Sequence, residues 1–274
     1  MEGLTEVTKE QERARARRRY ERQQANLAQR DSDRARRMRL TAIILTVALV
    51  VGVAAVLGGV FGSSSSDEAT PAATSTTTLA DGCEEPPAAL GTAAKIPLPD
   101  AATAAGKTYV ATVTTNCGDI EFTLDGTKAP QAVAAFNELA KQNYYLNSPC
   151  HRLTTGELKV LQCGDPTGTG SGDPGFGYAV ENAPKDGVYP RGTLAMARTQ
   201  DPKKGTGGQF FIVYGDSTLP DPDGYTVFGT VTSGLDIVDK IAAAGVAPGG
   251  SSPDDGFPAA PISILRVAVT EKKA

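Results

Sequence analysis

The sequence predicts a mainly β domain, built as a closed antiparallel barrel of eight strands with two capping helices and preceded by one transmembrane helix and a disordered tether. Two observations support the barrel. Short segments that alternate apolar and polar residues recur from about residue 108 onward, and many of them are rich in β-branched or aromatic residues. Only two segments repeat apolar residues at helical spacing, so strands and helices do not alternate as they would around a parallel sheet. Closure would remove the exposed edges of such a set of strands.

The domain is expected to begin with a hairpin and a helix. Residues 109–114 (YVATVT) alternate and are rich in β-branched side chains, and residues 120–124 place Ile, Phe and Leu at every second position. The intervening Asn-Cys-Gly-Asp supplies a turn. Pro130 lies in the first turn of a helix that ends before Asn143, and its apolar residues recur at helical spacing.

The remaining elements are predicted from similar patterns. Leu235, Val238 and Ile241 form the apolar face of a second helix at residues 235–244. Residues 156–157 provide the turn between the next two strands. Further strands are expected at residues 150–153, 158–163, 192–198, 209–214, 225–231 and 262–269.

The N-terminal part of the chain predicts a membrane anchor. Residues 1–39 contain twelve Lys and Arg against seven Asp and Glu, whereas the rest contains fifteen against twenty-four. Leu40 to Phe61 is an uncharged apolar run, long enough for the roughly 20-residue helix that crosses a bilayer. It is longer than the apolar core of a cleaved signal peptide, about 7–15 residues. Because arginines crowd its N-terminal side, we expect the N-terminus in the cytoplasm and the body of a single-pass protein outside. This neighbouring run also disfavours nucleic acid as the partner of the basic tail.

These observations divide the chain into four segments. A basic cytoplasmic tail covers residues 1–39, and a transmembrane signal anchor covers residues 40–61. Residues 62–98 are rich in Ser, Thr, Pro and Ala and form a linker, because this composition cannot build a core. The folded domain is expected at residues 99–274.

All four cysteines lie beyond the anchor, which favours disulfide bonds. If the hairpin folds about Gly156, Cys150 and Cys163 lie opposite each other, and Cys83 is left to pair with Cys117. Four buried thiols are the alternative. A metal site is disfavoured because the spacings are wide.

Four sequence blocks resemble the cyclophilin-type peptidyl-prolyl cis-trans isomerases, in particular their membrane-anchored bacterial members. In order, they are HRL…VLQCGDPTGTGSGDPGF, RGTLAMAR, GGQFFIVY and YTVFGTV, and the similarity extends from about Thr108 to Thr270. The resemblance implies a cyclophilin-like barrel and a surface groove for proline-containing segments of unfolded or secreted proteins. It implies no cofactor, and we expect no metal and a monomeric protein. The expected function is to assist the folding of extracytoplasmic proteins.

The resemblance assigns Arg152 as the catalytic residue. Rotation about an X–Pro bond faces a barrier of about 18–20 kcal/mol, because the amide bond has partial double-bond character. Lowering it requires a site that prefers the twisted amide, in which charge has returned to the ring nitrogen. A guanidinium can hydrogen-bond that nitrogen or the adjacent carbonyl without changing its protonation. The alternative for this arginine is a structural ion pair.

The resemblance also implies eight substrate-binding residues: Val160, Gln162, Ala197, Arg198, Gln209, Phe211, Leu219 and Tyr225. The apolar members would form the pocket and its rim around the proline ring, and the tyrosine stands where many members have a histidine. The two glutamines would hold the substrate backbone and orient the arginine. Ala197 and Arg198 lie on the strand that is expected to pair with the bound peptide. Phe210 and Phe228 are expected in the core.

Three departures from the family pattern bear on substrate binding. The stretch between Arg152 and Gln162 is about two residues longer than usual, which places Lys159 where a pocket phenylalanine is common, unless Leu158 fills the gap. Arg198 stands where the family usually has asparagine. The chain has no tryptophan, so tight cyclosporin binding is not expected. The first two departures leave open a second hypothesis, a catalytically weak module that binds proline-containing segments at the membrane.

Three other motifs are better explained by structure than by chemistry. Residues 170–175 match GxGxxG, but Pro174 and Gly177 argue against the helix that a dinucleotide site needs. His151 could be the base of a Ser-His-Asp triad, but the sequence contains no nucleophile-elbow motif. The histidine is instead expected to face the barrel interior and to be hydrogen-bonded. Residues 221–224 lack the remaining ligands of a calcium loop and are expected to form a tight turn.

Overall fold

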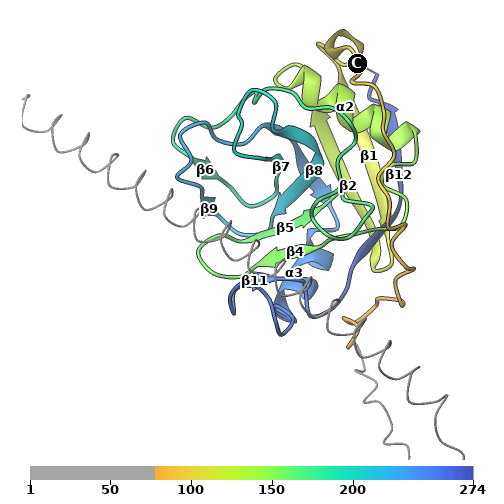
Figure 1. Cartoon of the computed structure of the whole chain (residues 1–274), viewed down its shortest axis with the longest axis vertical. Coiled ribbons are helices and arrows are strands. Elements are labelled where there is room, and N and C mark those ends of the chain that lie inside the picture. The colour runs from red at the N-terminus through yellow and green to blue at the C-terminus, as the bar shows by residue number, and fades with distance from the viewer. Residues whose placement is uncertain (1–77, 274) are drawn as a thin grey trace, which may run out of the picture. The chain divides into compact units, whose positions relative to one another are not determined.

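A computed structural model of the chain describes residues 78–273 (Figure 1). The predicted cytoplasmic tail, the anchor at residues 40–61 and residues 62–77 of the linker therefore lie outside the described residues. Within residues 78–273, no helix has both the length and the apolar character needed to cross a membrane.

Ten strands form one strongly curled sheet, in the order β11-β4-β5-β8-β7-β10-β2-β1-β12-β3, and every pairing in it is antiparallel. Its strands are β1 (Thr108–Thr115), β2 (Gly118–Asp125), β3 (Ser148–Pro149), β4 (Arg152–Thr154), β5 (Val160–Cys163), β7 (Thr193–Arg198), β8 (Thr206–Val213), β10 (Val227–Ser233), β11 (Asp255–Gly256) and β12 (Ser263–Glu271). A separate two-stranded sheet pairs β6 (Val188–Tyr189) with β9 (Ser217–Thr218).

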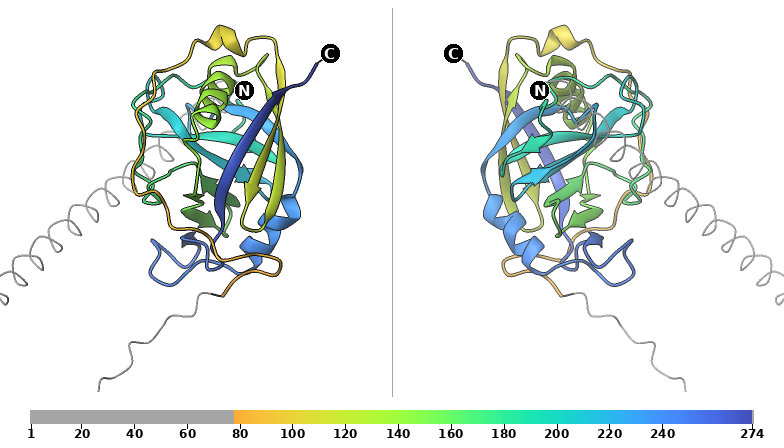
Figure 2. Two further views of the ribbon diagram at one scale, coloured as in Figure 1. Left: turned by 90° about the vertical axis from the view of Figure 1, so that its right-hand side faces the viewer. Right: turned by 90° about the vertical axis from the view of Figure 1, so that its left-hand side faces the viewer.

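Two helices lie at opposite ends of the curled sheet (Figure 2). They are α2 (Pro130–Lys141) and α3 (Leu235–Ala243), and a short 3-10 helix, η1, covers Ala101–Thr103. Both helices begin where the sequence predicts, α2 with its proline in the first turn. The prediction of a mainly β domain with two helices is therefore confirmed.

The closed eight-stranded barrel is not confirmed, because the sheet has ten strands and no hydrogen-bonded ladder in the described residues joins β11 with β3. β3 forms one edge of the sheet, and β4 lies beside β11, which forms the other edge. Only Cys150 and His151 separate β3 from β4 in the sequence. The pairing of β3 with β12 ends nearby, where Pro149 and Pro261 have no N–H to donate. A curled, open sheet is the result.

The main core fills the inside of the curl. One face of α2 packs there, and its Phe136 lies 5.2–5.6 Å, between ring centroids, from Tyr145, Phe210 and Phe228. All four rings are almost completely buried. The predicted core positions of Phe210 and Phe228 are confirmed.

Part of the predicted linker packs against the domain (Figure 2). The amide of Glu84 donates to the Asn116 carbonyl at 2.8 Å, and the amide of Ile96 donates to the Pro174 carbonyl at 2.7 Å. The predicted disulfide pairs, Cys83–Cys117 and Cys150–Cys163, are both formed. The first bond attaches residues 78–98 to the turn between β1 and β2.

Candidate active site

Side-chain alternation separates the candidate site from the core. Along β5 and β8, Leu161, Phe210 and Ile212 point into the main core. Their neighbours point to the opposite, outer face, because successive side chains of a strand alternate between faces. Gln162 and Phe211 are therefore on the outer face of the sheet.

One row of cross-strand neighbours crosses that outer face. Arg152 on β4 pairs with Gln162 on β5. Gln162 pairs with Phe211 on β8, and Phe211 pairs with Ala195 on β7. Directly paired residues share a face and lie about 4.5–5.5 Å apart at Cβ. The row therefore places the guanidinium and the phenylalanine on one surface, although they are 59 residues apart in the chain.

The apolar end of this row is a small cluster separate from the main core. Its buried members are Val160, Tyr189, Ala195, Phe211 and Val213, and its partly buried members are Leu158, Ala197, Leu219, Tyr225 and Val227. The rings of Phe211 and Tyr225 meet edge to face, with centroids 5.6 Å apart. Five of the eight substrate-binding residues predicted from the resemblance thus come together here. We refer to this set as the outer apolar cluster.

Arg152 lies at the polar end of the row and is held on two sides. Its Nε and Nη2 donate to the two carboxylate oxygens of Asp255, each at 2.8 Å. Its Nη1 donates to Gln162 Oε1 at 3.3 Å. The pKa of Arg152 is raised, chiefly by the hydrogen bonds to Asp255, so the guanidinium stays charged. The ion pair weighed as an alternative for Arg152 is present, and the guanidinium still borders the predicted site.

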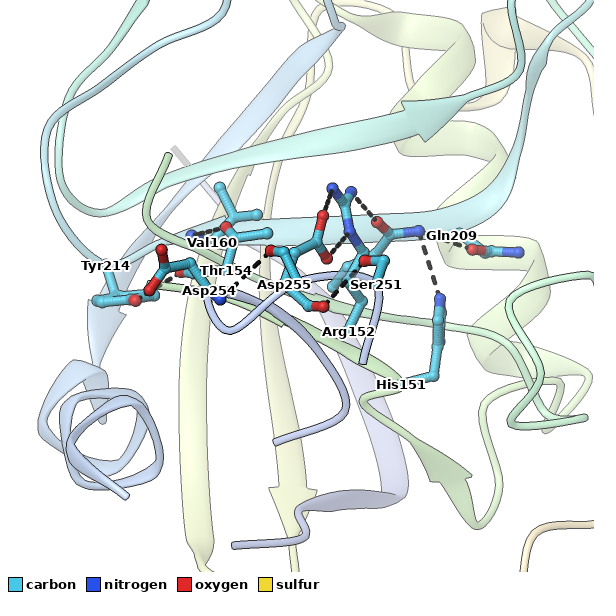
Figure 3. Close-up of polar contacts among 11 residues, drawn as sticks. His151, Arg152, Thr154, Val160, Gln209, Tyr214, Ser251, Asp254 and Asp255 are labelled. Atoms are coloured by element: carbon cyan, nitrogen blue, oxygen red, sulfur yellow. Dashed lines mark hydrogen bonds and ion pairs between the residues drawn. The ribbon is translucent and has the colours of Figure 1, made fainter. Parts of the chain in front are cut away.

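A relay of amides extends from Arg152 along the outer face (Figure 3). Gln162 Nε2 donates to Gln209 Oε1 at 2.9 Å. Gln209 Nε2 in turn donates to the carbonyls of Gly170 and Gly172, at 3.0 and 3.3 Å. Each glutamine is thereby fixed in one orientation, because its oxygen accepts and its nitrogen donates within the same chain of bonds.

A cavity of about 560 Å³ opens beside this relay. The glycine-rich residues 170–177 line one part of it, and residues 204–205, residues 207–209, Ala197 and Arg198 line another. Gly172 allows the loop to pass close to Asp165, since a Cβ there would lie 1.9 Å from the Asp165 Oδ1. These glycines lie in a loop, and no helix follows it before β6.

His151 is buried behind the relay. Its Nε2 lies 3.3 Å from Gln162 Nε2, so a neutral ring can accept a hydrogen bond from that amide. Burial lowers the pKa of His151 and outweighs the opposite effect of Asp165. The neutral ring of His151 can therefore help to hold the Gln162 amide in place.

The structure resolves two of the departures seen in the sequence. Leu158 packs against the outer apolar cluster, whereas Lys159 is exposed to solvent. Arg198 borders the cavity beside the glutamines, and its Nη2 forms an ion pair with Asp221 Oδ1 at 2.7 Å. The two side chains are only 3% and 7% exposed. The pocket wall is therefore apolar at the first position, and the arginine is a buried structural group at the second.

Asp255 is the polar residue of this site that the sequence interpretation missed. It lies 103 residues from Arg152 and belongs to a segment, SSPDDGFP, whose composition indicates only a turn. Only the pairing of β11 with β4 brings the two together. Among the described residues, no group of three or more His, Cys, Asp or Glu side chains could hold a metal ion.

Comparison with known proteins places this arrangement in a family. The sequence model described as "Cyclophilin type peptidyl-prolyl cis-trans isomerase/CLD" matches residues 110–269. A probable peptidyl-prolyl cis-trans isomerase B of Mycobacterium leprae is 43% identical over 207 residues, which are 69% of this chain and 66% of that protein. The protein of the same description from Mycobacterium tuberculosis is 46% identical over 166 residues, 56% of this chain and 52% of that protein. The chain thus spans about half to two thirds of the length of these curated relatives.

Solved structures agree with the sequence match. A crystal structure of a cyclophilin type peptidyl-prolyl cis-trans isomerase from Cryptosporidium parvum superposes with a TM-score of 0.51 and 28% identity, covering 61% of this chain and 99% of that one. A second crystal structure of that protein, in the presence of the dipeptide Ala-Pro, gives a TM-score of 0.50 and 29% identity. Because the family model covers more than half of its residues, this chain belongs to the cyclophilin type peptidyl-prolyl cis-trans isomerase family.

Proposed function

We propose that this protein is a peptidyl-prolyl cis-trans isomerase in which Arg152 stabilises the twisted X–Pro amide. The observation that carries the proposal is the row on the outer face, which places a charged guanidinium beside an apolar cluster built around Phe211. The cluster suits a proline ring, which is apolar and has no N–H. The relatives named as isomerases, and the homologous structure obtained with Ala-Pro, support the same substrate class.

The proposed mechanism needs no covalent step. Proline occupies the outer apolar cluster, and the preceding peptide runs along β7 and the two glutamines. Two N–H groups of the guanidinium, one on Nη1 and one on Nη2, are not used by Asp255 or Gln162. As the amide twists, its nitrogen gains electron density, and a guanidinium N–H stabilises that charge more strongly than it stabilises the planar ground state.

We further propose that the protein acts outside the cytoplasm, held by the anchor predicted at residues 40–61. Uncatalysed proline isomerisation takes tens of seconds or longer and can limit folding. The two disulfides suit an oxidising compartment, where such bonds persist. Protease treatment of intact cells should degrade the folded domain while residues 1–39 stay protected. Protection of the domain would contradict this topology.

The activity is tested with the full-length chain in detergent, by NMR exchange spectroscopy on an X–Pro peptide. Arg152→Ala is expected to lower kcat by about 10²-fold, the effect of losing one donor to a developing charge. Peptide affinity should change little, because the apolar cluster remains intact. A wild-type chain that binds the peptide without accelerating exchange would instead support the binding-module hypothesis. Lys159 gives that hypothesis little support, because its side chain is exposed while Leu158 packs with the outer apolar cluster.

A further inference from the structure

The Asp255 carboxylate meets Arg152 in a two-pronged ion pair. Both oxygens accept at 2.8 Å, one from Nε and one from Nη2. The two side chains are 40% and 30% exposed, so neither is part of the core. Exposed ion pairs contribute little to stability in general. We therefore expect this pair to orient Arg152 more than it stabilises the fold. Two parallel hydrogen bonds fix the plane of the guanidinium.

The surrounding backbone is built to hold that carboxylate in place (Figure 3). β11 pairs with the edge of β4, with Asp255 opposite Thr154. The Thr155 amide donates to the Asp254 carbonyl at 3.0 Å, and the Ser251 hydroxyl donates to the Asp255 carbonyl at 2.9 Å. Gly250 packs so tightly that a Cβ there would lie 2.6 Å from the Asp255 carbonyl oxygen. Backbone hydrogen bonds thus attach the segment from residue 250 to 256 to the strand that carries Arg152 and to the residue that follows it.

Asp255 and Gln162 together leave a defined edge of the guanidinium open. Three of its five N–H groups are used, and the remaining two belong to Nη1 and Nη2. An arginine without such partners has about 2 kcal/mol of rotamer entropy to lose when it is fixed in a transition state. Here most of that ordering is already present in the free protein.

We propose that Asp255 is a positioning residue, which holds the Arg152 guanidinium with two N–H groups directed toward the substrate amide. The inference rests on the proposed catalytic role of Arg152. Positioning is distinguishable from masking, in which the carboxylate would withdraw charge from the site and slow the reaction. The two ideas predict opposite effects when the negative charge is removed.

The test compares Asp255→Asn and Asp255→Ala with Asp254→Asn in the full-length chain in detergent. Asp254 is the matched control, because it is the adjacent acidic residue and its carboxylate contacts Thr155 instead of Arg152. Asp255→Asn should lower kcat about 10-fold, since small misplacements of a catalytic group are costly, and should leave KM within about 2-fold. Asp255→Ala should lower kcat further, whereas Asp255→Glu should recover part of the activity and Asp254→Asn should match the wild type.

Two further measurements separate positioning from a general structural effect. The Arg152 Nε–H NMR signal should be sharp and slow to exchange in the wild type and lost in Asp255→Ala, while the melting temperature changes little. On an Arg152→Ala background, Asp255→Asn should have no additional effect on kcat. If Arg152→Ala is impaired but Asp255→Asn is as active as the wild type, or more active, Asp255 does not position the arginine and the proposed function stands. If Arg152→Ala is unimpaired, the proposed function itself fails.

Discussion

Arg152 and His151 are adjacent in the chain, yet the structure keeps one charged and the other neutral. The arginine reaches a carboxylate at the surface of the outer face. The histidine is buried, and its pKa is lowered chiefly by that burial. A second cation beside Arg152 would repel it, and a protonated ring could no longer accept a hydrogen bond from Gln162. The neutral state of His151 therefore preserves the hydrogen bond with Gln162 and avoids repulsion of Arg152.

The pH dependence of stability tests this account of His151. The histidine pKa is about 6.5 in the unfolded chain and lower in the folded one, so only the unfolded chain takes up a proton as the pH first falls below 6.5. The free energy of unfolding should thus be level above that pH and decline below it, by at most about 1.4 kcal/mol per pH unit. The decline ends once the pH passes below the folded pKa.

Urea unfolding between pH 8 and pH 5 measures this decline. Because His151 is the only histidine in the chain, His151→Gln should remove the slope, whatever it does to the overall stability. An equal slope in the wild type and the variant would show that another group is responsible.

At the scale of elements, the segment between β9 and β10 brings the rim of the outer apolar cluster into place. This segment carries Leu219 and Tyr225. Arg198, at the end of β7, holds it by three contacts: the ion pair with Asp221, a 2.8 Å hydrogen bond from Nε to the Gly224 carbonyl, and a guanidinium 5.0 Å from the centroid of the Tyr225 ring. Arg198, which was expected on the strand beside the bound peptide, thus also holds one loop of the site.

Removing Arg198 should therefore lower the stability of the folded domain. Arg198→Ala removes the positive charge beside the Asp221 carboxylate, which is only 7% exposed, and the free energy of unfolding should fall by about 3–5 kcal/mol. Asp221→Ala on the same background should recover part of that loss. Denaturant unfolding of the two single variants and the double variant measures this coupling. Strictly additive losses would show that the pair is not coupled.

For the domain as a whole, the two disulfides constrain different regions. Cys150–Cys163 closes a loop of 13 residues that contains Arg152 and ends beside Gln162. Cys83–Cys117 spans 34 residues and ties the N-terminal extension to the sheet. The extension in turn contacts the loop that lines the cavity, since Lys95 Nζ lies 2.8 Å from Asp173 Oδ2.

Removing each bond should give a different balance of effects. Loop-closure entropy predicts losses of about 3 kcal/mol for the shorter loop and about 4 kcal/mol for the longer one, equivalent to a drop in Tm on the order of 10 °C. Calorimetry of the Cys→Ala pairs measures these losses. Loss of Cys150–Cys163 should also lower isomerase activity more than loss of Cys83–Cys117 does, because only the first bond closes the loop that contains Arg152. Equal activity in the two paired variants would contradict the different roles.

Features that depend on local pattern could be predicted from the sequence. Helical spacing located both helices and alternation located the strands, because the face of a residue depends on its own strand or helix. Gln162 and Phe211 were assigned to the site by the family resemblance. The hairpin between β4 and β5 also predicted the Cys150–Cys163 bond, since its two ends are close in the chain.

Contacts between segments far apart in the sequence could not be predicted from local pattern. Asp255 meets Arg152 only because β11 adds to the edge of β4, and nothing within either segment encodes that pairing. Burial of Arg198 likewise depends on a loop that begins after β9. The open edge of the curled sheet follows from where its terminal ladders stop. Each depends on how elements far apart in sequence meet, which local periodicity does not specify.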